Sequence, residues 1–361
     1  MEKTFLVFLE EKEYNQSVCL PHKKTLREDI SMETQIRTHK VRNTFFLLLT
    51  SLIWGAAFVA QSVSMDYIEP LTFICLRSLI GGLFLLPCIW IMDRLGEKHK
   101  PMRAEGTAKE DGKDNPVNMA AGITGKERPY RWWTDRKLLF GGMVCGLFLF
   151  AANCFQQTGI QYTTVGKAGF ITSFYIIIVP LLGIFFKRFC GVLTWISVVI
   201  ALVGLYFLCM NEAFQIQPGD FLILISAFLF AGQIMAIDYF NTFLDGVKMS
   251  CIQFFTGAVC ACAGMLLFEN PQISLIIQAA GPVLYTGIMS TGVAYTLQII
   301  GQKGMNPTMA ALILSLESVF SALSGFVILG QIMSGRELLG CILMFVAIIL
   351  AQLPDFRRIS H

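Results

Sequence analysis

One carboxylate lies at the centre of an apolar stretch that is long enough to cross a membrane. The stretch runs from Pro307 to Leu329, and Glu317 is near its middle. An acidic side chain at that depth is costly, so it usually faces a cavity or a partner. Glu317 could bind a cationic or amine group of a ligand, or take up a coupled proton. The structural alternative is a protonated, hydrogen-bonded carboxyl that holds helices together.

Two basic side chains also fall inside apolar stretches. Arg77 lies in the first third of the stretch 70–92. Its guanidinium could contact an anionic group such as a carboxylate, or it could bind helix-end carbonyls or reach outward to the interface. Lys167 lies near the start of the stretch 165–186, and we expect it to reach the interface.

Uncharged polar residues inside the apolar stretches form a second group of candidates. Their side chains need hydrogen-bond partners in lipid, so we expect them to face the bundle interior or a wet cavity. Hydrogen bonding between helices alone could explain many of them: Gln61, Asn153, Gln156, Gln157, Gln233, Gln253, Tyr295 and Gln298. The residues we predict to bind ligand, besides Glu317 and Arg77, are Trp54, Asn153, Gln156, Tyr175, Gln233, Tyr295 and Gln298.

The stretch around Glu317 has a counterpart earlier in the chain. When Phe155 is placed against Leu297, the segments 155–185 and 297–327 align without a gap, which makes Tyr175 the counterpart of Glu317. Identical pairs include Gln156/Gln298, Gly159/Gly301, Ala168/Ala310, Ile171/Ile313, Ser173/Ser315, Leu181/Leu323 and Gly183/Gly325. Two stripes, mostly of small residues, also coincide: Gly169, Ser173, Ile176, Pro180 and Gly183, and Ala311, Ser315, Ser318, Ala322 and Gly325. Their helical spacing puts each stripe on one face, where another helix can approach closely.

The composition is that of a membrane protein. The chain is 55% hydrophobic and 15% charged, with a mean hydropathy of +0.61. Its net charge of +3 gives no support for a nucleic-acid partner. The eleven cysteines are scattered and show no metal-binding spacing, so we interpret them as small buried hydrophobes and expect no metal or cofactor.

Ten apolar spans are predicted, each long enough for a bilayer core of about 30 Å. They are 44–63, 70–92, 138–158, 165–186, 191–210, 219–239, 249–268, 278–300, 307–329 and 337–353. Because each half has five spans, the second half must enter the membrane from the opposite side. The predicted fold is therefore an all-α integral membrane protein of ten transmembrane helices in two inverted five-helix repeats.

The repeats are predicted to occupy 44–210 and 211–353, with a cytoplasmic, disordered insertion at 93–137. Residues 1–43 are predicted to be a disordered cytoplasmic tail, and residues 354–361 a second cytoplasmic tail. With this topology, 25 of the 28 Lys and Arg residues lie on the cytoplasmic side, as the positive-inside rule requires.

No enzymatic pattern is present. All four histidines, at positions 22, 39, 99 and 361, lie outside the predicted spans. The chain has no HExxH, no GxSxG and no phosphate-binding GxxxxGK[ST] motif. We therefore expect neither an enzyme nor a pump that hydrolyses ATP within this chain.

Several segments resemble EamA-type members of the drug/metabolite transporter superfamily. They are Leu52–Gln61 with its Trp-Gly opening, Leu71–Gly82 with its arginine, Gly159–Ile171 and Leu314–Gln331. The resemblance covers about Thr44–Leu353 and departs from the family at Lys187-Arg188 and Gly330-Gln331, where a Gly-Glu pair is common. It implies two inverted five-helix repeats, a central substrate cavity, and export or exchange of small metabolites.

These observations together predict a secondary transporter that exports or exchanges an amino acid or a similar small metabolite by alternating access. The resemblance implies a bacterial plasma membrane, a small-molecule substrate and a substrate or proton gradient as the driving force. Because the duplicated chain carries both inverted halves, a monomer could suffice, and a homodimer is the alternative. A broad-specificity efflux carrier for drugs or cations is one alternative. A channel or scaffold without carrier activity is another.

Overall fold

The computed structural model describes residues 26–98, 132–163, 165–186, 191–209, 218–329 and 334–352. The chain divides into two units, Met1–Arg42 and Asn43–His361, and the helical bundle belongs to the second, which includes helix α2 from Asn43 onward. Most of the predicted insertion and the predicted tail 354–361 lie outside the described residues.

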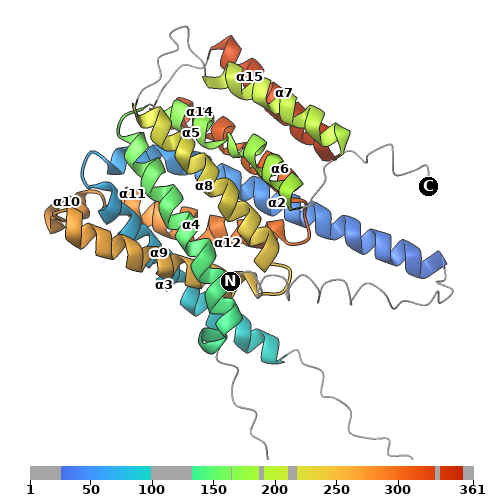
Figure 1. Cartoon of the computed structure of the whole chain (residues 1–361), viewed down its shortest axis with the longest axis horizontal. Helices are drawn as coiled ribbons and strands as arrows, with labels where there is room; N and C mark the ends of the chain where they lie inside the picture. The colour runs from blue at the N-terminus through green and yellow to red at the C-terminus, as the bar shows by residue number, and fades with distance from the viewer. Residues whose placement is uncertain are drawn as a thin grey trace, which may run out of the picture. The chain divides into compact units, whose positions relative to one another are not determined.

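The described residues form helices and no strands, which confirms the all-α fold (Figure 1). The helices are α2 Leu26–Ser64, α3 Pro70–Lys98, α4 Arg136–Ile160, α5 Val165–Thr172, α6 Tyr175–Phe185, α7 Val192–Cys209, α8 Pro218–Phe240, α9 Gly246–Phe268, α10 Ile273–Gln278, α11 Ala280–Tyr285, α12 Thr296–Gln302, α13 Pro307–Leu314, α14 Glu317–Leu329 and α15 Gly335–Gln352. A 3₁₀ turn, η1, spans Trp132–Thr134, and a π-helical segment, η2, spans Thr286–Tyr295.

Within the part of the chain that the structure describes, eight segments are long and apolar enough to cross a membrane. They are Val41–Ser64, Pro70–Arg94, Arg136–Ile160, Ala168–Phe185, Pro218–Phe240, Gly246–Phe268, Ala280–Gln302 and Pro307–Ile328. The shorter apolar helices Val192–Phe207 and Leu338–Ala351 coincide with the fifth and tenth predicted spans. The count of ten therefore stays a prediction.

Two helices extend beyond the predicted spans. Helix α2 begins at Leu26, inside the segment predicted as a tail, and α3 continues to Lys98, inside the predicted insertion. Both extensions contain Glu, Arg, Lys and Leu, which favour helix even where the hydrophobic pattern has ended.

Acidic and amide side chains fix where several helices begin. Asp135 accepts hydrogen bonds from the N–H groups at the start of α4, and Asp245 does the same at the start of α9. Asn306 caps α13, and the Glu269 carboxylate accepts the N–H groups of Leu71 (2.7 Å) and Thr72 (2.6 Å) in α3. These bonds satisfy groups that have no partner within their own helices.

The fourth and ninth predicted spans are interrupted at equivalent positions, although the sequence predicted continuous helices. Helix α5 ends at Thr172 and α13 ends at Leu314, and these two residues are counterparts in the repeat. The backbone tightens there, because Phe174 N–H donates to a carbonyl three residues earlier, as does Leu316 N–H (both 3.2 Å). A mid-helix 3₁₀ turn of this kind often marks a hinge.

Serine side chains provide a physical reason for the second interruption. Ser315 Oγ donates to the Leu312 carbonyl (2.8 Å), and Ser318 Oγ donates to the Ser315 carbonyl (2.7 Å). Such bonds compete with the regular helical pattern. In the first half, Pro180 lies inside α6 and has no N–H to give to the preceding turn.

The two interrupted helices cross each other where they are interrupted. Helix α5 packs against α14, and α6 packs against α13, so the crossing is antiparallel. Gly169 lies against Ser318 and Ser321, and Ser173 Oγ is 3.5 Å from the carbonyl oxygen of its own counterpart, Ser315. A residue that touches its counterpart lies on the symmetry axis. The two stripes therefore face each other across a pseudo-two-fold axis, as an inverted repeat requires.

Other helix pairs follow the same symmetry. Helix α4 packs on α9, and its image in the second half is the packing of α3 on η2. Helices α7 and α15, the last of each half, lie side by side in Figure 1.

We predict that Gly55→Ala destabilises the bundle. A Cβ at Gly55 would lie 2.4 Å from Phe320 Cβ and 2.7 Å from the Phe320 carbonyl carbon, so α2 and α14 would have to separate. Overpacking of this kind costs about 1–3 kcal/mol. Thermal unfolding in detergent should show a lower midpoint for Gly55→Ala, whereas Gly281→Ala should not lower it, because no atom lies within 4 Å of a Cβ there. Equal midpoints for the two variants would contradict the close approach.

Candidate functional site

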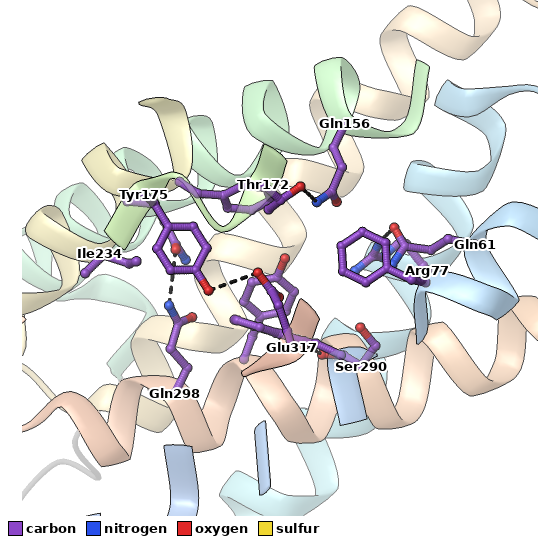
Figure 2. Close-up of a pocket in the computed structure, with 14 residues that line it drawn as sticks. Gln61, Arg77, Gln156, Thr172, Tyr175, Ile234, Ser290, Gln298 and Glu317 are labelled. Carbon is purple, nitrogen blue, oxygen red and sulfur yellow. Dashed lines mark hydrogen bonds between the residues drawn. The ribbon is translucent and has the colours of Figure 1, made fainter. Parts of the chain in front are cut away.

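A pocket lies at the crossing of the two interrupted helices (Figure 2). It contains about 410 Å³ of space not filled by protein atoms, part of it continuous with solvent. Its lining comes from α2, α3, α4, α5, α6, α8, η2, α12 and α14 and consists of Trp54, Phe58, Gln61, Arg77, Gln156, Thr172, Tyr175, Phe230, Gln233, Ile234, Ser290, Tyr295, Gln298 and Glu317. The structure thus brings together eight of the nine predicted binding residues, all except Asn153.

Glu317 and Tyr175 form the centre of the pocket. Each is the first residue after an interruption, Tyr175 in α6 and Glu317 in α14. The Tyr175 hydroxyl donates to Glu317 Oε1 (2.9 Å), and both side chains are buried. Since the two residues are repeat counterparts, this hydrogen bond also lies on the pseudo-two-fold axis. A group on the axis lies equally close to both halves of the bundle.

Arg77 is buried and faces the pocket. Its Nε donates to Thr291 Oγ1 (3.1 Å) and its Nη1 to Gln61 Oε1 (3.5 Å), while the guanidinium carbon lies 5.5 Å from the centre of the Phe73 ring. Only 2% of the residue is exposed, so Arg77 does not reach the interface. No acidic side chain among the described residues pairs with it. The guanidinium therefore has donors available for an anionic ligand.

Gln156 and Gln298, which are counterparts in the repeat, each donate a hydrogen bond within the pocket. Gln156 Nε2 donates to Thr172 Oγ1 (3.0 Å), and Gln298 Nε2 donates to Gln233 Oε1 (3.4 Å). In Figure 2 the carboxyl of Glu317 points toward Tyr175, and Arg77 with Gln61 lies on the other side of it.

Aromatic rings close the pocket beside these polar groups. Trp54 and Tyr295 have ring centres 4.6 Å apart, and Trp54 Nε1 donates to the Ser290 carbonyl (3.3 Å). Asn153, the counterpart of Tyr295, is buried and interacts with the Tyr295 hydroxyl, so it supports the lining from behind. The Asp238 side chain is half-buried near the end of α8, away from this lining.

The π-helical segment η2 shapes one wall of the pocket. It contributes Ser290 and Tyr295 to the lining and Thr291 to the contact with Arg77. A π-helix accommodates an extra residue in a helical stretch and is frequent at functional sites. Hydrophobic periodicity does not show it, because the pattern before and after the segment is that of an ordinary helix.

Sequence reasoning left out several lining residues. Phe58, Thr172, Phe230, Ile234 and Ser290 were not predicted, and Gln61 was considered only as a buried amide. One signal was available, because Phe58 and Gln61 in the first span have the same spacing as Phe230 and Gln233 in the sixth. Residues one turn from a predicted site residue share its face of the helix.

The chain belongs to the EamA-like transporter family, whose model matches residues 42–103, 119–210 and 217–353. It is 27% identical over 313 residues to a protein named "Uncharacterized transporter" from Archaeoglobus fulgidus, covering 85% of this chain and 84% of that protein. It is 26% identical over 316 residues to the "Uncharacterized transporter YwfM" of Bacillus subtilis, with 85% and 92% covered. A solved crystal structure with 18% sequence identity has a TM-score of 0.63, covering 88% of this chain and 99% of that one, and so shares the fold. The protein is a multi-pass membrane transporter.

We predict that Tyr175→Phe destabilises the protein although it removes only one oxygen atom. The change leaves the buried Glu317 carboxyl without its hydrogen bond, and an unpaired buried polar group costs about 1–3 kcal/mol. The thermal unfolding midpoint should fall for Tyr175→Phe and stay unchanged for Tyr206→Phe, where the ring is half exposed. An unchanged midpoint for Tyr175→Phe would show that the hydrogen bond contributes nothing to folding.

Proposed function

We propose that this transporter is a secondary carrier that exports or exchanges an amino acid or a similar small zwitterion across the plasma membrane by alternating access. Arg77 would bind the carboxylate of the substrate, and Glu317 would bind its ammonium group or exchange a proton with it. Both termini would be cytoplasmic, as the distribution of Lys and Arg predicts.

The observation that carries the proposal is that one acidic and one basic side chain line the same pocket without an ion pair between them. Arg77 and Glu317 both line the pocket, yet each has only neutral hydrogen-bond partners among the described residues. A buried charge without a counter-ion is costly. A ligand that carries both a carboxylate and an ammonium group would supply both missing partners at once.

Efflux of drugs or lipophilic cations is the second candidate. The rings of Trp54, Phe58 and Phe230, together with the Glu317 carboxyl, would suit a flat cation. Arg77 argues against it, because its positive charge in the same pocket repels a second cation. A channel or scaffold would not show saturable counterflow, which a carrier must show.

We predict that Glu317→Gln abolishes pH-dependent export while leaving the fold intact. The amide keeps a hydrogen-bond acceptor for Tyr175 but neither carries a charge nor releases a proton. Metabolites released by cells that express wild type, Glu317→Gln or empty vector should be compared at two external pH values. One compound should accumulate only with wild type, and its amount should depend on pH. Equal export by the variant at both values would make Glu317 a structural residue.

We predict that Arg77→Gln raises the substrate concentration for half-maximal counterflow. Hydrogen bonds to charged groups contribute about 1.5–3 kcal/mol, which corresponds to roughly 10- to 100-fold in affinity. Arg77→Lys keeps the charge without the forked donors, so its effect should be intermediate. The substrate concentration for half-maximal counterflow is measured for both variants in proteoliposomes. If Arg77→Gln had the same substrate concentration for half-maximal counterflow as wild type, the guanidinium would not contact the substrate.

A further inference from the structure

Gln253 carries a buried amide that does not line the pocket. It lies on α9, is completely inaccessible to solvent, and neither its Oε1 nor its Nε2 has a hydrogen-bond partner among the described residues. Leaving both polar atoms of a buried amide unpaired is costly, so such a group requires an explanation. Its location in the repeat provides one.

Gln253 is the symmetry counterpart of Arg77. The second and seventh spans align without a gap in a register that pairs Cys75 with Cys251, Gly81 with Gly257 and Arg77 with Gln253. These helices, α3 and α9, also begin alike, each following an acidic residue at position 69 or 245.

Contacts in the structure support this alignment independently. A Cβ on Gly287 would lie 2.8 Å from Ile80 Cβ and 3.4 Å from the Arg77 carbonyl oxygen. In the other half, a Cβ on Gly146 would lie 2.8 Å from Thr256 Cβ and 2.7 Å from the Gln253 carbonyl oxygen. The same register aligns Ile80 with Thr256 and Arg77 with Gln253. Gly287 and Gly146 therefore contact equivalent positions of the two halves.

The same comparison explains the π-helical segment. Gly146 is paired with Gly287, and Gln156 is paired with Gln298. The segment from Gly287 to Gln298 in the second half is therefore one residue longer than the matching segment from Gly146 to Gln156 in the first half. The register of the second half therefore differs before η2 and after it. A π-helical turn accommodates one residue more than an α-helical turn, which accounts for this difference.

The two halves nevertheless occupy different arrangements around the pocket. Arg77 lines it and is hydrogen-bonded to the pocket residue Gln61, whereas Gln253 does not line it, although the counterpart of Gln61, Gln233, does. Carriers built from inverted repeats change their open side when the repeats exchange arrangements around a fixed site. After such an exchange, α9 would present Gln253 to the pocket as α3 now presents Arg77.

From this geometry we infer that Arg77 and Gln253 are alternate members of one substrate site, Arg77 in the conformation described here and Gln253 in the opposite one. The inference rests on the proposed function. The Gln253 Nε2 donates to the substrate carboxylate and its Oε1 accepts from the ammonium group, which gives both unpaired atoms a partner. Neutral hydrogen bonds are weaker than those of a guanidinium, so the carrier holds the substrate more loosely in the conformation that uses Gln253.

Face-specific kinetics of Gln253→Leu test this inference. Counterflow of a mixture of the standard protein amino acids is measured in right-side-out and inside-out vesicles. The substrate concentration for half-maximal transport should rise by about 5- to 10-fold at one face and by less than about twofold at the other, because a neutral hydrogen bond is lost in one conformation only. Arg77→Gln should show the reverse pattern. If the substrate concentration for half-maximal transport by Gln253→Leu were unchanged at both faces, or equally raised at both, the inference would be overturned.

Gln302→Leu is the matched control. Gln302 is also a buried glutamine with both polar atoms unpaired, but it lies at the last position of α12 and does not line the pocket. The substrate concentration for half-maximal transport by Gln302→Leu should stay within about twofold of wild type at both faces. Both leucine variants remove unpaired buried atoms, so their thermal stability should equal or exceed that of wild type. Loss of transport in Gln253→Leu at full stability cannot then be attributed to unfolding.

A second measurement separates failure of this inference from failure of the proposed function. Gln253→Cys and Arg77→Cys are treated with a membrane-impermeant methanethiosulfonate, and modification at each position is determined by peptide mass spectrometry. Modification of the two positions from opposite faces supports the inference even if wild type transports none of the amino acids tested, a result that would reject only the substrate. No modification of Gln253→Cys from either face, or modification from the same face as Arg77→Cys, would overturn it.

Discussion

The cost of burying polar groups in an apolar bundle is the constraint on which the rest of this structure depends. Every backbone and side-chain polar group at membrane depth needs a partner within the protein. At the crossing of the two interrupted helices this requirement is met on a symmetry axis, where Tyr175 bonds to Glu317 and Ser173 approaches Ser315. The interruptions, the close helix packing and the pocket all surround these contacts.

The pocket contains two kinds of polar groups, which differ in how far their hydrogen-bond partners offset the cost of burial. Amides such as Gln156 and Gln298 find neutral partners on neighbouring helices and help to hold the bundle together. Arg77 and Glu317 receive only neutral partners, so part of the cost of their burial remains. That remaining cost is available for ligand binding, since a zwitterion would satisfy both groups.

Symmetry explains why unpaired groups occur where they do. In a duplicated chain, each residue of one half has a counterpart that occupies the other arrangement. Arg77 has partners in the arrangement described here, and its counterpart Gln253 has none. A group that is satisfied in only one of two conformations is unpaired in the other. On the inference drawn above, the asymmetry between the halves is a property of the conformation as well as of the sequence.

The membrane fold, the duplication and eight of the residues that line the pocket could be predicted from the amino-acid sequence, because hydrophobic periodicity and the internal repeat specify which residues share a helix face. It did not determine the interruptions before Tyr175 and Glu317 or the π-helical segment η2. Those depend on hydrogen bonds that change within a continuous apolar pattern. The inward orientation of Arg77 becomes visible only in the folded protein, since its partner Thr291 lies far away along the chain and no local pattern indicates that contact.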